Sequence, residues 1–486
     1  MKFIATTLLF FLTTACVFAQ YTTPNTGVDW TLDDIAAASP STVTVSGNNY
    51  TLHENLTVAT NDILRIDNNL TLLIEQDVRV TIFGSFFIDA EDVIITAVNQ
   101  NLPYDGFRFE EFSEINIQNS IIEYGGGMQV LTETFTLNNC TVQYHVSGVT
   151  TGAAITFSRG MPIITNNTFF NNVNPAMSSG ANQSVSAYVF NNHIEGNNQT
   201  NNNRPQINFG GTRPNDTLKI IQNYIIGDRD LIMAGGIAVA NLAGGTVLAL
   251  IEDNVIKDNR YGITVVGPNS FAVIKNNVIE DNDTQGDPML GGSGINLNAP
   301  TGGQTIVASE NQIRRNLWGV SIQGDVAANF GDDNENTGGN VFSENGNNGE
   351  IFALYNNGPA TIMAKHNCWI EGEDITLAEA EEVIFHQVDD PSLGEVIFDP
   401  LCEFMSVEDI ALTNFYFYPN PAVNTIYFNN TYFFAQIRIL DINGKILLSQ
   451  QVAQGLNEVN FQLASGIYFV QFENGKNNVV KKLIVN

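Results

Sequence analysis

The sequence is poor in cysteine, in basic residues and in long apolar runs. It has 4 cysteines in 486 residues, too few for a disulfide scaffold, and it lacks Cys-x-x-Cys or His-Cys spacings that suggest zinc. Its 20 basic residues stand against 51 acidic ones, and the net charge of −31 repels nucleic-acid phosphates. Beyond the first residues, no apolar run approaches the roughly 20 residues of a membrane helix. These features argue against nucleic-acid binding and against a transmembrane segment.

The first residues, MKFIATTLLFFLTTACVFAQ, predict a secretory signal peptide. A basic second residue precedes an apolar run, and Val17 to Ala19 resemble a signal-peptidase cleavage site. We expect the cut after Ala19, so that residues 1–19 are the signal peptide and the mature protein is exported and soluble. The alternative is a lipoprotein acylated at Cys16, but the three residues before Cys16 match a lipobox poorly.

Asn recurs throughout the rest of the chain in one repeated pattern. The stretch EDNVIKDNRYGITVVG (residues 252–267) returns as SENQIRRNLWGVSIQG (residues 309–324). An apolar residue follows most of these marker Asn residues after two places, and Asn or Asp follows after five. The nine markers span 228 residues in eight intervals, so one repeat has about 28 residues. They are Asn139, Asn167, Asn192, Asn223, Asn254, Asn277, Asn311, Asn340 and Asn367.

A period of this size indicates a solenoid or a propeller. The apolar spacing of two argues against a helical repeat, and a propeller blade would need about 40 to 45 residues. We therefore predict an all-β chain with a parallel β-helix over residues 50–404, into which residues 20–49 lead. Asn suits the sharp corners of such a coil because it tolerates left-handed backbone, and stacked Asn amides satisfy one another.

The pattern resembles the right-handed parallel β-helix proteins of the pectate-lyase-like superfamily over about residues 50 to 400. The segments AKHNCW (residues 364–369) and EVIFDP (residues 395–400) are similar to the common ending of that superfamily. The resemblance implies a carbohydrate ligand and a site on one outer face of the coil. Loops longer than a coil needs leave it at residues 198–205, 285–293 and 325–338.

The sequence changes character at about Asn414, after a linker over residues 405–413. Alternating strands separated by Asn-Gly and Ser-Gly turns predict a small antiparallel β-sandwich over residues 414–486. The motifs YPNP, DINGK, GIY and KKL appear there in order and resemble the type A C-terminal sorting domain of the type IX secretion system. This resemblance implies the type IX machinery as a partner. It also implies export through the periplasm to the outer-membrane surface or the extracellular space.

The repeat places charged residues in columns on adjacent coils, which lie about 4.8 Å apart. The first column alternates in sign, as cross-strand pairing predicts. The second column brings two Asp carboxylates together, and these would repel unless a cation or an arginine relieves them. Its two Asp residues are therefore candidate calcium ligands, and calcium is the one cofactor we consider. The first column is Lys257, Glu280 and Arg314, and the second is Asp258, Asp281 and Arg315.

Arg229 and Arg260 occupy matching positions on consecutive coils and are the candidate catalytic residues. Two guanidinium groups in one column could hold a uronate carboxylate and favour loss of its α-proton. They could equally neutralise nearby Asp residues. Tyr261 and Trp318 share one position two coils apart and, with Arg315, are the candidate substrate-binding residues. This aromatic pair either stacks on a sugar or packs the corner of the coil.

The cysteines allow one disulfide. Cys140 and Cys368 each follow a marker Asn and are eight intervals apart, roughly 38 Å along the coil, which is too far for a bond. If a bridge forms, it joins Cys368 to Cys402, and Cys140 stays a buried free thiol.

Together these patterns predict an exported protein that binds or degrades extracellular polysaccharide. If it is an enzyme, we expect a polysaccharide lyase or a glycoside hydrolase, with a base and carboxylates in register within a groove between the long loops. The alternative is a non-catalytic adhesin or surface-matrix protein, for which a flat ladder of side chains is expected. The sequence carries no complete active-site motif of the superfamily.

Overall fold

The computed structural model describes residues 20–287, 290–402, 416–430, 434–442, 444–453, 455–473 and 478–485. The described chain forms two compact units, a long one that ends at Leu401 and a small C-terminal one. The predicted signal peptide and the predicted linker lie outside the described residues.

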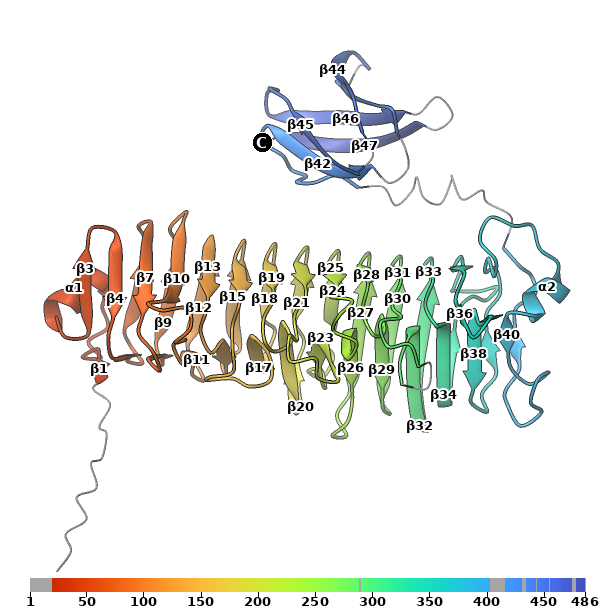
Figure 1. Cartoon of the computed structure of the whole chain (residues 1–486), viewed down its shortest axis with the longest axis horizontal. Coiled ribbons are helices and arrows are strands. Elements are labelled where there is room, and N and C mark those ends of the chain that lie inside the picture. The colour runs from red at the N-terminus through yellow and green to blue at the C-terminus, as the bar shows by residue number, and fades with distance from the viewer. Residues whose placement is uncertain are drawn as a thin grey trace, which may run out of the picture. The chain divides into compact units, whose positions relative to one another are not determined.

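The long unit is a parallel β-helix, as predicted (Figure 1). One coil consists of β27 (Val247–Glu252), β28 (Val255–Lys257) and β29 (Ile263–Val266). The next coil consists of β30 (Ser270–Lys275), β31 (Val278–Glu280) and the start of β32 (Ser293–Ser309). Each strand pairs in parallel with its counterpart one coil later, β27 with β30, β28 with β31 and β29 with β32. The chain therefore returns to the same place once per repeat.

The apolar residues two places after the markers form one column of the core. Because side chains in a strand alternate between faces, one residue of each three-residue strand points inward. The column passes through β25 (Tyr224–Ile226), β28, β31, β33 (Gln312–Arg314) and β35 (Val341–Ser343). Every member of it is 0% exposed, namely Ile225, Ile256, Ile279, Ile313 and Phe342.

The marker Asn residues lie inside the coil, where they form a hydrogen-bonded ladder. Asn277 Oδ1 accepts from the backbone N of Asn254 at 3.0 Å and from its Nδ2 at 2.9 Å. Asn277 Nδ2 in turn donates to Asn311 Oδ1 at 2.9 Å. The prediction of stacked amides is confirmed, but the left-handed corner lies one residue before the position that the sequence predicts. The left-handed backbone belongs to the residue before the marker, for example Asp253 (φ 58°) and Asn276 (φ 55°).

Two positions depart from the repeat as the sequence suggested it. Cys140, not Asn139, aligns with the ladder, because its backbone N–H donates to Asn167 Oδ1 at 2.9 Å. In the second ladder, five places after each marker, the side chain of Gln206 fills the rung that the repeat assigns to Asp228, five places after Asn223. Its Oε1 accepts from Asn197 Nδ2 at 3.1 Å, and its Nε2 donates to Asn259 Oδ1 at 3.0 Å.

The N-terminal segment already belongs to the coil. β1 (Gln20–Thr22) and β2 (Asp29–Trp30) pair in parallel with β5 (Asn55–Val58) and β6 (Ile63–Ile66). The short helix α1 (Leu32–Ala38) follows and has a capping box at its start. At the far end, α2 (Leu377–Glu381) precedes β40 (Ile384–Phe385) and β41 (Val396–Ile397), which complete the last turn.

The C-terminal unit is antiparallel, as predicted. β42 (Thr425–Asn430) pairs with β45 (Gly455–Asn460) in one sheet. The other sheet has the order β44 (Ile446–Gln451), β43 (Gln436–Leu440), β46 (Gly466–Glu473) and β47 (Asn478–Val485). The unit has a hydrophobic core of its own. No helix in the described ranges is long and apolar enough to cross a membrane.

Cys368 and Cys402 are both disulfide-bonded. Cys140 is a free thiol, 3% exposed, and burial raises its pKa to about 12.

Candidate functional site

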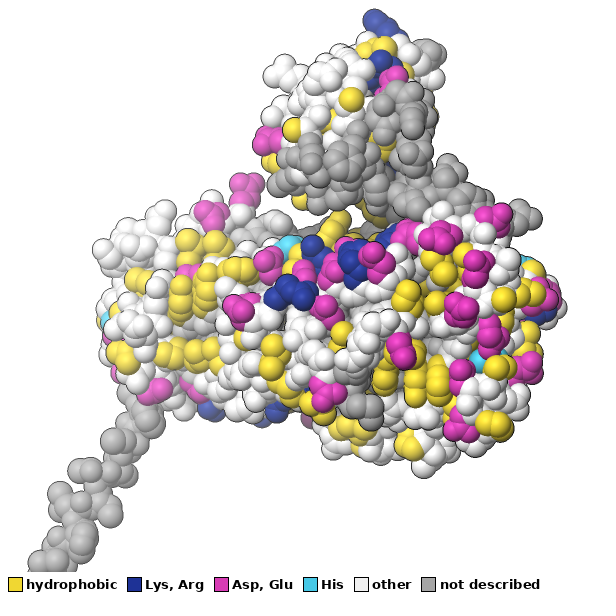
Figure 2. Space-filling model, turned by 45° about the vertical axis from the view of Figure 1, so that its right-hand side comes forward, with side chains coloured by type: hydrophobic (Ala, Val, Ile, Leu, Met, Phe, Trp, Pro, Cys, Tyr) yellow, Lys and Arg dark blue, Asp and Glu magenta, His cyan; other side chains and the backbone are white. Residues whose placement is uncertain are grey.

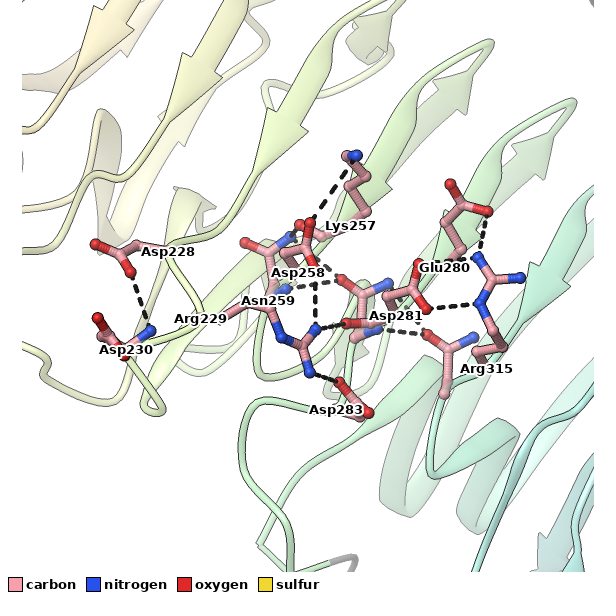
Figure 3. Close-up of polar contacts among 12 residues, drawn as sticks. Asp228, Arg229, Asp230, Lys257, Asp258, Asn259, Glu280, Asp281, Asp283 and Arg315 are labelled. Atoms are coloured by element: carbon pink, nitrogen blue, oxygen red, sulfur yellow. Dashed lines mark hydrogen bonds and ion pairs between the residues drawn. The ribbon is translucent and has the colours of Figure 1, made fainter. Parts of the chain in front are cut away.

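The charged columns form an ion-pair network on one edge of the β-helix. Arg229 Nη1 donates to Asp258 Oδ1 at 2.9 Å, and its Nη2 donates to Asp283 Oδ1 at 2.7 Å (Figure 3). These hydrogen bonds, first that to Asp258, raise the pKa of the Arg229 guanidinium. Acidic and basic side chains lie next to each other along this edge (Figure 2).

Arg315 neutralises Asp281 in the same way. Its Nε donates to Asp281 Oδ1 at 2.7 Å, and its Nη2 donates to Asp281 Oδ2 at 2.8 Å and Glu280 Oε2 at 3.0 Å (Figure 3). The guanidinium is therefore bidentate on one carboxylate, the strong form of this pair. Asp258 and Asp281 are thus each neutralised by an arginine. Among the described residues, no group of three or more His, Cys, Asp and Glu side chains could hold a metal ion.

A separate pocket of about 240 Å³ opens beside this network on the outer surface of the coil. It gathers three of the candidate residues, Arg260, Tyr261 and Trp318, whereas Arg229, Arg315, Asp258 and Asp281 are not among its lining residues. Its lining combines aromatic, hydroxyl and amide side chains. The lining residues are Arg260, Tyr261, Thr264, Leu290, Gly291, Ser293, Asn296, Trp318 and Gln323.

Strand register puts the two aromatic residues in one column with a small residue between them. Ile263 on β29 pairs with Ile295 on β32, so Tyr261 stands level with Ser293, two places before each of them. Ser293 in turn pairs with Trp318, the first residue of β34 (Trp318–Asn329). Tyr261 and Trp318 are therefore two coils apart, as the sequence indicated, or about 9.6 Å along the axis.

Both rings are supported on the sides that face away from Ser293. The Tyr261 ring covers Gly235, where a Cβ atom would lie 2.2 Å from Tyr261 Cζ. Trp318 stacks on Tyr355 of β38 (Leu354–Asn357), with ring centroids 4.9 Å apart and planes at 4°. Tyr355 stacks in turn on Phe385 at 4.4 Å and 5°. The space over Ser293 is thus left open between two fixed aromatic walls.

Arg260 lies where two of the long loops meet. Its Nη1 donates to Asn203 Oδ1 in the loop of residues 198–205, and its Nη2 donates to the backbone O of Leu290 in the loop of residues 285–293. Arg260 is 7% exposed. Arg229 and Arg260, which match in sequence, therefore point to different places, and the predicted paired guanidinium site does not form.

Two buried donors of the pocket residues make no hydrogen bond within the described part of the chain. They are the Nε–H of Arg260 and the Nε1–H of Trp318. Burial raises the pKa of the Tyr261 phenol, and the opposing effect of the Arg260 charge is smaller. Both donor nitrogens are shielded from solvent, so the polar groups that the pocket offers a ligand are the hydroxyl and amide side chains of its lining.

The floor of the pocket was not anticipated from the sequence. Thr264 and Asn296 of the lining are level with each other on β29 and β32 and face outward. Asn296 Nδ2 donates to Thr264 Oγ1 at 2.7 Å, which fixes the amide. The polar residues within the alternating stretches GITVV and SGINLN could have predicted this floor, because every second residue of a strand on a coil faces outward.

Comparisons with known proteins identify the C-terminal unit. Residues 416–486 match the secretion system C-terminal sorting domain. The chain therefore carries a type IX sorting domain, which directs it to the cell surface or the extracellular space. No curated protein matches the chain.

Among solved structures, a crystal structure of a mutant of the periplasmic alginate epimerase AlgG is similar to this chain. The identity is 12%, the match covers 78% of this chain and 82% of the epimerase chain, and the TM-score is 0.38. A likeness at this level carries no argument about activity or substrate.

Proposed function

We propose that the β-helix binds an extracellular polysaccharide in the pocket between Tyr261 and Trp318. The observation that carries the proposal is the pair of supported aromatic walls, two coils apart, on either side of Ser293. A sugar ring has apolar C–H faces and polar edges. It fits a site with apolar walls and a few placed polar groups, here Thr264, Asn296 and Gln323.

The route of the protein supports a ligand outside the cell. Type IX secretion brings the chain to the cell surface or the extracellular space, where a polysaccharide would be accessible to it. Its net charge of −31 repels acidic polysaccharides at long range. Recognition of the polysaccharide therefore has to come from local contacts. The pocket supplies such contacts.

The pocket chemistry favours binding over cleavage. Glycoside hydrolysis uses two carboxylates, yet the described lining contains no Asp, Glu, His or Lys. A lyase needs a base whose pKa lies near the working pH, whereas the pKa of Tyr261 is raised. Arg260, a candidate catalytic residue from the sequence, uses both of its terminal nitrogens to join two loops. A polysaccharide-binding surface protein is therefore our conclusion.

A glycan array tests this function directly. The mature chain from Gln20 should bind a defined set of glycans, and Trp318→Ala should weaken that binding about tenfold or more. A stacked aromatic contributes about 0.5–1.5 kcal/mol beyond the area it buries. Tyr188→Ala is the matched control, because Tyr188 stacks on Phe190 (5.5 Å) elsewhere on the coil. It should bind like the wild type.

Three results bear on the alternatives. Equal binding by the wild type and Trp318→Ala would overturn the proposed site. New reducing ends or unsaturated uronate products from a bound glycan, absent with Trp318→Ala, would make the protein an enzyme. We expect a calcium chelator to leave binding unchanged, because arginines already neutralise Asp258 and Asp281.

A further inference from the structure

The pocket is closed in both directions along the axis of the β-helix. On one side Tyr261 covers Gly235 so closely that even a methyl group there would clash with the ring. On the other side Trp318 is the first of three stacked rings, followed by Tyr355 and Phe385. A polymer that ran along the axis through the pocket would have to pass through an aromatic wall at each end.

A third side is closed at the corner of the coil. Arg260 donates to the backbone O of Leu290, and Gly291 lies against the arginine stem, where a Cβ would be 2.8 Å from both Cγ and Nε of Arg260. Asn203 holds the other end of the guanidinium. The chain around Leu290 and Gly291 is thereby tied to the coil and forms an end wall.

The remaining lateral side follows the strand direction across the sheet of β29, β32 and β34. Asn296 and Gln323 line the pocket there, and Asn298 continues beyond them, with its Nδ2 donating to Gln323 Oε1 at 3.1 Å. The pocket is thus a dead end that opens onto a row of amides. At about 240 Å³ it is smaller than the roughly 300–1,000 Å³ of sites for drug-sized ligands, so it has room for about one sugar ring.

We propose that this pocket takes the single residue at the end of a glycan chain or branch, and that Ser293 determines this by keeping the place open. The inference rests on the proposed function and specifies its ligand. Ser293 is level with Tyr261 and Trp318, and three of the four lateral sides are closed by an aromatic ring or by the Arg260 corner. A large ring at residue 293 would join the two walls into one stack and fill the space that the terminal sugar needs.

Chain-end recognition predicts how binding scales with polymer length. The probe is the polysaccharide with the strongest Trp318-dependent signal on the array, used intact and after partial acid hydrolysis at the same mass. If the hydrolysate has about ten times more chain ends, the mature full chain should find about ten times more binding sites per mass. An unchanged number of sites per mass would show internal binding and overturn the inference while leaving the proposed function intact.

A substitution tests the role of Ser293. Ser293→Tyr should reduce affinity for the same probe about tenfold or more, with an unchanged thermal unfolding midpoint. Ser343→Tyr, also on the outer surface of the coil but away from the pocket, is the control and should bind normally. Wild-type affinity in a folded Ser293→Tyr protein would overturn the gating role. If Ser293→Tyr does not fold, the chain-end count still decides. Binding indifferent to Trp318→Ala would instead remove the proposed function itself.

Discussion

The Asn ladder should be a main source of stability, and Asn277→Ala measures its contribution. Asn277 is 0% exposed and accepts two hydrogen bonds from Asn254 while donating to Asn311. The substitution leaves the buried backbone N–H of Asn254 without its acceptor, which costs about 1–3 kcal/mol. The cavity left by the amide adds to this loss. We expect the free energy of unfolding to fall by about 2–5 kcal/mol.

Urea denaturation followed by circular dichroism checks the magnitude. Asn116→Ala is the control, because Asn116 lies on β12 (Glu114–Gln118) between the inward residues Ile115 and Ile117 and so faces outward. Surface substitutions of this kind usually change stability by no more than about 0.5 kcal/mol. If Asn277→Ala were as mild as Asn116→Ala, the ladder would be a consequence of the fold and not a support for it.

Three further predictions concern acid, thiols and export. Burial lowers the pKa of His145 to about 4 from 6.5. The unfolded chain therefore binds the proton first, and the free energy of unfolding should fall as the pH drops from about 6.5 to about 4. In urea titrations, His145→Gln should reduce this dependence of the free energy of unfolding on pH. Iodoacetamide should label Cys140 only after unfolding and Cys368 and Cys402 only after reduction, as read by intact mass; labelling of Cys140 in the native protein would contradict its burial. Deletion of residues 414–486 should leave the protein in the periplasm of its host, and normal surface delivery of the truncated chain would contradict the sorting role.

The fold could be predicted because its inward positions use few residue types. A column such as Ile225, Ile256 and Ile279 must stay apolar to remain buried, so the period is visible without a structure. The first marker, Asn139, was placed in the ladder because the pattern identifies a rung by its Asn, and Asn also occurs at corners. Asn139 has the left-handed backbone (φ 53°) of a corner, and Cys140 occupies the ladder position. Asn serves both positions, so its identity alone does not separate them.

The candidate site could be predicted only where the backbone determines it. Tyr261 and Trp318 share a column because strand register follows from the repeat. Side-chain direction does not follow from it. Arg229 turns to Asp258 and Asp283, whereas Arg260 turns to two loops whose course no periodicity describes. Ser293 gave no signal, since its importance lies in being small.

The small size of residue 293 explains how a regular coil acquires a binding site. A solenoid repeats its outward positions at about 4.8 Å, so neighbouring side chains of similar size cover each other and leave a filled ladder, as Tyr355 and Phe385 do. A cavity arises where one member of such a column is replaced by a small residue while its neighbours are held back by other contacts. Ser293 is that small residue. The Tyr261 ring packs on Gly235 and the Trp318 ring stacks on Tyr355, so neither ring covers Ser293. The site therefore depends on one small residue between two supported rings, which is why a large ring at residue 293 should reduce affinity about tenfold or more without unfolding the coil.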